Sequence, residues 1–127
     1  MVIPWSDEVF NYTSKHQARP ATGELVVGDE RHEIGGAAGE AWGVLDVGRG
    51  RWPAEITWNW GGGAGRVGDH VLGLQFGAKW TEGSGYTENG FFVDGRLTKI
   101  GRELDWSYAW DAPMEPCASS TLTASST

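Results

Sequence analysis

The sequence predicts a single all-β domain built from antiparallel strands. Its 127 residues include 20 glycines and 8 tryptophans, a combination that suits tight turns and broad apolar strand faces. Long helices are disfavoured because glycine inside a helix costs about 1 kcal/mol relative to alanine. We assign this domain to residues 1–116. Residues 117–127 form a Ser/Thr-rich tail with one sizeable apolar residue and are expected to be disordered.

Short runs of β-branched and aromatic residues mark the expected strands. They are residues 9–15, 23–28, 31–34, 55–60, 70–77, 91–97 (as a hairpin) and 103–108. Strict alternation in 55–60 puts Trp58 and Trp60 on one face, which we expect to be buried. The glycine-rich stretches are predicted to be irregular: 35–50 as a structured loop with a short strand, and 61–65 as a turn.

Two turn signals predict hairpins. Asp94-Gly95 can supply the positive φ angles of a two-residue turn, which places Val93 opposite Arg96. Gly28-Asp29-Glu30 joins the strands at 23–28 and 31–34. Residues 63–68 match a dinucleotide-binding pattern, but the next segment alternates as a strand, so we interpret them as part of a hairpin.

Charge and cysteine content exclude several classes of function. A net charge of −7 repels phosphate backbones, so nucleic acid is not an expected partner. The single cysteine favours a reducing, cytoplasmic compartment, and no segment has the apolar length of a membrane span. The histidines lie far apart in the sequence, and no motif indicates a metal or another cofactor.

Polar residues embedded among aromatic ones are the candidate site residues. They are Asp46, Arg49, Asn59 between Trp58 and Trp60, and Glu88-Asn89 before Phe91. A carboxylate at Glu88 or Asp46 that was enclosed in an apolar pocket would be suited to general acid or base catalysis. In the alternative reading Asp46 pairs with Arg49 to fix a loop, while Asn59 and Glu88 face water.

Three runs of sequence resemble one protein family. They are residues 42–53, 57–61 and 87–97, and the similarity extends in order from about residue 10 to 116. These runs are similar to domain of unknown function 2804 (DUF2804), a family distantly related to lipocalin-like β-barrel proteins that include carotenoid hydratases and tocopherol cyclases. The resemblance implies a portion of a lipocalin-like barrel or an open sheet. Because family members are longer, it also implies a truncated or partial member whose unpaired sheet edges could form a homo-oligomer.

The leading functional prediction is the binding of a small apolar molecule in a tryptophan-lined β-barrel pocket. Its expected lining is Trp58, Trp60, Trp80, Phe91, Asn59, Asn89 and Arg49. One alternative is an enzyme of the hydratase, cyclase or isomerase type that acts on a lipid-like or isoprenoid substrate. Glu88 or Asp46 would then be its acid. The other alternative is an inactive truncated paralogue.

Overall fold

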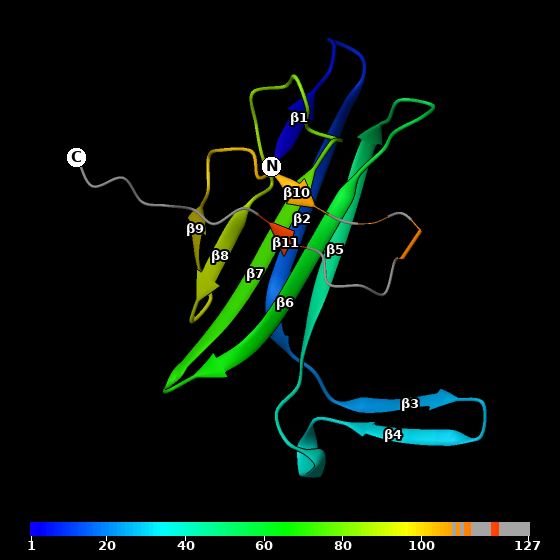
Figure 1. The fold of residues 1–127 in the computed structure, drawn as a ribbon, viewed down its shortest axis with the longest axis vertical. Coiled ribbons are helices and arrows are strands. Elements are labelled where there is room, and N and C mark those ends of the chain that lie inside the picture. The colour runs from blue at the N-terminus through cyan, green and yellow to red at the C-terminus, as the bar shows by residue number, and fades with distance from the viewer. Residues whose placement is uncertain (108, 110, 113–117, 120–127) are drawn as a thin grey trace.

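The computed structural model describes residues 1–107, 109, 111–112 and 118–119, and its main body consists of two antiparallel sheets (Figure 1). The first sheet has three strands in the order β1-β2-β5: Val2–Pro4, Phe10–Pro20 and Trp42–Arg51. The second has four strands in the order β6-β7-β8-β9: Asn59–Val67, His70–Ala78, Gly90–Val93 and Arg96–Lys99. The predicted all-β, antiparallel fold is confirmed, and the described strands form open sheets.

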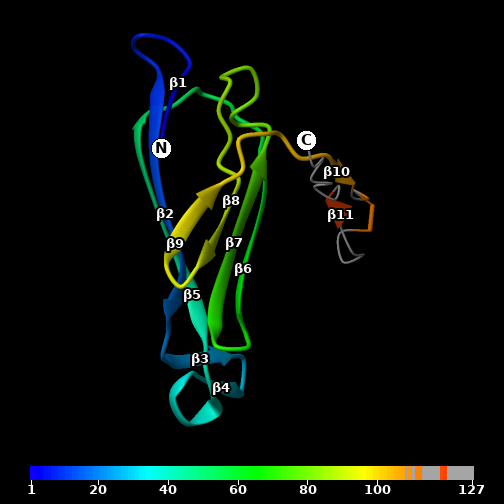
Figure 2. The same cartoon turned by 90° about the vertical axis from the view of Figure 1, so that its left-hand side faces the viewer.

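The remaining elements lie outside this body. A hairpin of β3 (Gly23–Val27) and β4 (Glu30–Ile34) projects from one end of the two sheets, followed by the short 3-10 helix η1 (Gly36–Ala38) (Figures 1 and 2). β10 (Trp106–Ser107) pairs with β11 (Ala118–Ser119). Within the described residues, no helix is long and apolar enough to cross a membrane.

Both predicted hairpins are confirmed. Val93 pairs with Arg96, and the turn residues Asp94 and Gly95 have φ angles of 50° and 79°. Val27 pairs with Glu30 across the other turn. The predicted strand at 70–77 corresponds to β7. The stretch 63–68 belongs to the β6–β7 hairpin, as interpreted from the sequence.

The predictions for the glycine-rich segments are wrong. Residues 42–51 form the long strand β5 instead of a loop with a short strand, and residues 61–65 form the middle of β6 instead of a turn. Conversely, residues 55–58 are irregular, so the strand predicted at 55–60 begins only at Asn59. Each misjudged strand is held along its length by a neighbour, β5 by β2 and β6 by β7. Long-range pairing has therefore overridden local propensity.

The C-terminal predictions fall mostly outside the described residues. Of the predicted disordered tail, 117–127, the structure describes Ala118 and Ser119, which form β11. Of the strand predicted at 103–108, it describes residues 103–107, and Trp106 and Ser107 are the strand residues among them.

The two sheets face each other across a polar interior. In β2 the alternation places Asn11, Thr13 and Gln17 inside, while Phe10 and Tyr12 are exposed. In β7 the inward residue is Gln75, and its neighbour Leu74 is exposed. Gln17 Nε2 donates to Gln75 Oε1 at 2.8 Å, which joins the sheets directly. Buried polar groups need such partners, so this interior is held by hydrogen bonds as well as by apolar packing.

Candidate functional site

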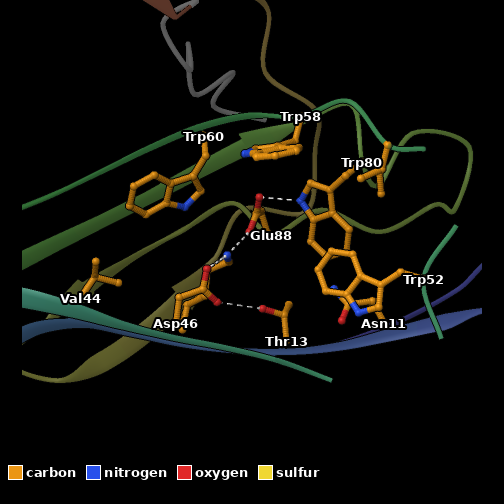
Figure 3. Close-up of a pocket in the computed structure, with 12 residues that line it drawn as sticks. Asn11, Thr13, Val44, Asp46, Trp52, Trp58, Trp60, Trp80 and Glu88 are labelled. Atoms are coloured by element: carbon orange, nitrogen blue, oxygen red, sulfur yellow. Dashed lines mark hydrogen bonds and ion pairs between the residues drawn. The ribbon is translucent and has the colours of Figure 1, made fainter. Parts of the chain in front are cut away.

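A pocket of about 670 Å³ opens between the two sheets (Figure 3). β2 and β5 form one side, and the segment leading into β6, together with the residues after β7, forms the other. Its lining consists of Asn11, Thr13, Lys15, Val44, Asp46, Gly48, Trp52, Ile56, Trp58, Trp60, Trp80 and Glu88. The structure therefore brings together Trp58, Trp60, Trp80, Asp46 and Glu88, which the sequence analysis singled out.

Four indole rings, those of Trp52, Trp58, Trp60 and Trp80, line the pocket. Trp80 is buried, and its ring meets the edge of Trp5 at a centroid distance of 6.2 Å. Trp58 and Trp60 face the pocket, but they are 62% and 40% exposed, so the prediction that they are buried is wrong. They lie at the free edge where the irregular segment 52–58 enters β6, and no neighbouring strand among the described residues covers them there. Both rings are thus accessible from solvent.

Glu88 forms the floor of the pocket. Its side chain is 3% exposed and accepts hydrogen bonds from Trp80 Nε1 and Gln75 Nε2, each at 2.6 Å. Lys15 Nζ lies 3.5 Å from the oxygen that Gln75 contacts. Gly77 makes room for this carboxylate, because a Cβ at that position would overlap it. Each Glu88 oxygen therefore accepts a hydrogen bond from the protein, and the bond from Nε1 orients Trp80.

Lys15 and Asp46 form an ion pair beside Glu88. Lys15 Nζ donates to Asp46 Oδ2 at 2.6 Å and lies 5.9 Å from the ring centroid of Trp60. The other Asp46 oxygen accepts one long bond of 3.4 Å from the Thr13 hydroxyl. The Asp46 side chain is 48% exposed. One ammonium is thus set between two carboxylates at the base of the pocket.

Asn11 contributes an acceptor that is not satisfied within the described part of the protein. The residue is 1% exposed, and its Oδ1 has no hydrogen-bond partner among the described residues. A Cβ built on Gly48 would lie 3.0 Å from Trp52 Cζ2 and 3.8 Å from this Oδ1, so both groups converge on Gly48. The pocket wall therefore contains a buried acceptor that is left unpaired within the described part of the protein, which is uncommon in folded proteins.

The other predicted site residues lie elsewhere. Arg49 is three positions from Asp46 on β5 and therefore points to the opposite sheet face, where it lines a shallow hollow with Tyr12. It does not form the pair with Asp46 that the alternative reading required. Asn59 borders a different hollow, near Trp106. Phe91 pairs with Leu74 on the side of the second sheet that faces away from the pocket.

The Asn89 side chain links backbone segments by hydrogen bonds and does not line the pocket. It is fully buried, its Oδ1 accepts from the Gly77 N–H at 2.8 Å, and its Nδ2 donates to the Arg102 carbonyl at 3.0 Å. These bonds hold the end of β7 and the segment after β9 against the start of β8. They leave the Asn89 side chain outside the pocket lining.

A smaller hollow of about 350 Å³ lies on the other side of the Lys15–Glu88 pair. Lys99 lines it and donates to the Thr87 carbonyl at 2.8 Å. Burial lowers the pKa of Lys99, and the nearby Glu88 carboxylate opposes that shift. Within the described part of the chain, no three His, Cys, Asp or Glu side chains are grouped as a metal site would need.

The sequence analysis missed Asn11, Thr13, Lys15 and Trp52. The sequence does contain a pattern that could have identified three of them. Alternation along residues 11–17 places Asn11, Thr13 and Lys15 on one face of the strand.

Comparison with known proteins gives one result. No curated protein and no solved structure matches the chain. A family model described as "Domain of unknown function (DUF2804)" matches residues 1–123, which includes part of the Ser/Thr-rich segment beyond residue 116. The chain therefore belongs to the DUF2804 family.

Proposed function

We propose that this protein binds a small, largely apolar molecule in the pocket between the two sheets. The observation that carries the proposal is the arrangement of four indole rings around a space of about 670 Å³ with a hydrogen-bonded polar floor. That volume falls within the range of ligand pockets, which combine apolar walls with a few fixed polar groups. The exposed rings of Trp58 and Trp60 would gain free energy when a ligand removes them from water.

The polar floor favours binding over catalysis. An acid or base must exchange a proton with its substrate, whereas both Glu88 oxygens already accept hydrogen bonds from the protein. Asp46 is more accessible, but one of its oxygens is paired with Lys15. We therefore favour a binding protein over an enzyme of the hydratase, cyclase or isomerase type. The single cysteine supports a cytoplasmic setting for the binding protein.

Binding can be tested with N-phenyl-1-naphthylamine, a neutral aromatic probe that accepts energy from excited tryptophan. We expect saturable binding to the full chain. Trp58→Leu should weaken it about tenfold, because a ring contact that is worth about 1.4 kcal/mol is lost. Trp58 is largely exposed, so the variant should keep its fold. Trp42→Leu is the matched control because Trp42 does not line the pocket. Non-saturable uptake, or equal affinity in both variants, would contradict the proposal.

We also propose that the chain self-associates through its free strand edges. Among the described strands, β5 pairs only with β2, and β6 pairs only with β7. An unpaired edge presents main-chain donors and acceptors that a second copy can satisfy. Sedimentation at micromolar concentration should show a dimer that dissociates on dilution. Leu45→Lys, an exposed position on β5, should shift the equilibrium towards monomer. A monomer at every concentration would rule the association out.

A further inference from the structure

We infer that the ligand of this pocket is an organic cation, with an ammonium group held among the indole rings and an apolar body. This inference rests on the proposed binding function and specifies its ligand class. Three independent features of the pocket support it: its charge, its unused acceptors and the faces of its aromatic rings.

The charged lining is net negative. One ammonium, that of Lys15, faces the two carboxylates of Asp46 and Glu88, and Arg49 is on the other face of the sheet. The Lys15 ammonium is already engaged, at 2.6 Å from Asp46 and 3.5 Å from Glu88. The residues that line the pocket therefore sum to a net charge of −1, and a further cation, Lys99, lies near Glu88 in the neighbouring hollow, where its ammonium donates to the Thr87 carbonyl. In a site partly shielded from water, electrostatic interactions are stronger than in bulk solvent.

The polar lining also has acceptors to spare. Asn11 Oδ1 has no partner among the described residues, and Asp46 Oδ1 accepts a single bond of 3.4 Å. Asn11 Oδ1 is buried, whereas the Asp46 side chain is half exposed, so Asp46 Oδ1 is the acceptor that a ligand can reach. A primary ammonium group is a donor only, so it matches this oxygen without bringing an acceptor that would oppose it. A carboxylate or sulfate ligand would instead place its own acceptors against Asp46.

The indole rings supply the third feature. An aromatic face carries negative electrostatic potential and attracts cations within about 6 Å of the ring centroid, most strongly for tryptophan. Lys15 Nζ already lies 5.9 Å from the Trp60 centroid, so the protein's own ammonium makes this contact. Trp58 lies next to Trp60. Among the described residues, no Lys or Arg side chain lies over the Trp58 ring. Its exposed face is available to a ligand ammonium.

A matched series of linear C8 compounds separates charge from apolar binding. n-Octylammonium, 1-octanol and octanoate share an alkyl chain and differ in their polar end. Binding to the full chain is measured by tryptophan fluorescence at pH 7 and about 0.15 M salt, where the long-range field of the protein is screened beyond about 8 Å. We expect octylammonium to bind about tenfold more tightly than octanol, and octanoate to bind most weakly.

Asp46→Asn tests whether the preference arises in the pocket. The Asp46 side chain is half exposed, so the isosteric change should preserve the fold. It should reduce the preference for octylammonium over octanol to about twofold. Asp29→Asn removes the same charge from the β3–β4 turn and should leave the preference intact.

The outcomes separate this inference from the proposed function. If octanol or octanoate binds as tightly as octylammonium, the pocket binds apolar molecules but the cation inference is wrong. If Asp29→Asn lowers the preference as much as Asp46→Asn, the preference reflects overall charge, and the inference is likewise wrong. If none of the three compounds binds saturably, both the binding function and the inference fail.

Discussion

Replacing Gly77 with alanine should lower the free energy of unfolding by about 3 kcal/mol. A Cβ on Gly77 would overlap Glu88 Oε1 and lie 2.5 Å from the carboxylate carbon Cδ. The buried carboxylate would have to move, which breaks its 2.6 Å hydrogen bonds from Trp80 and Gln75. Urea unfolding followed by circular dichroism measures the change, which should appear as a lower midpoint with an unchanged slope.

Gly63→Ala is the matched control, since Gly63 lies on the neighbouring strand β6 and a Cβ added there would have no described atom within 4 Å. It should change stability by less than about 1 kcal/mol. A double-mutant cycle locates the cause, because Glu88→Ala removes the overlapping atoms. In that background Gly77→Ala should cost less than about 1 kcal/mol. Equal losses with and without Glu88 would show that the overlap is not the cause.

Local turn chemistry made part of this fold predictable. The β8–β9 hairpin follows from Asp94-Gly95, whose positive φ angles fix the pairing of Val93 with Arg96. Such a turn acts over a few residues, so its signal is complete within the local sequence. β7 was predicted for a similar reason, because regular alternation over residues 70–77 persists despite two glycines.

The two glycine-rich strands could not be predicted in this way. In β6, Gly62 and Gly63 have no side chains that could show alternation. Glycine is also required where neighbours approach closely: a Cβ on Gly62 would lie 2.8 Å from the Trp60 ring and 3.2 Å from Gln17 Nε2. The feature that resembles a turn in sequence is therefore a strand that is closely packed at Gly62 and open at Gly63. The contact with Gln17 comes from β2, which is distant in the chain, so local sequence does not reveal it.

The candidate site was predictable in its residue types and less so in its geometry. Glu88 was identified as a polar residue embedded among aromatic ones, and Trp80 as one of the aromatic residues expected to line an apolar pocket. Lys15 and Asn11 were missed because alternation defines the two faces of a strand but does not say which face points inward. In β2 the polar face points inward and the aromatic residues Phe10 and Tyr12 point out, which reverses the usual pattern.

Glu88→Gln should lower the free energy of unfolding by about 2 kcal/mol at pH 7, although it alters hardly any volume. Both carboxylate oxygens accept from donors in the wild-type protein, Trp80 Nε1 at one and Gln75 Nε2 at the other. A glutamine amide has one oxygen and one NH₂ group, so it must turn a donor towards one of these donors. It also removes the charge that Lys15 faces at 3.5 Å, although Lys15 keeps its bond to Asp46.

Glu82→Gln provides the control for this change, because Glu82 is exposed in the same connection between β7 and β8. It should alter stability by less than about 0.5 kcal/mol.

The environment of Trp80 gives a second readout, since the loss of its charged acceptor should shift the tryptophan emission of Glu88→Gln and leave that of Glu82→Gln unchanged. If Glu88→Gln were as stable as Glu82→Gln with the same emission, the carboxylate would not be holding Trp80 in place. The polar floor would then have to depend on the Lys15–Asp46 pair, whose carboxylate is half exposed to water and therefore less strongly held.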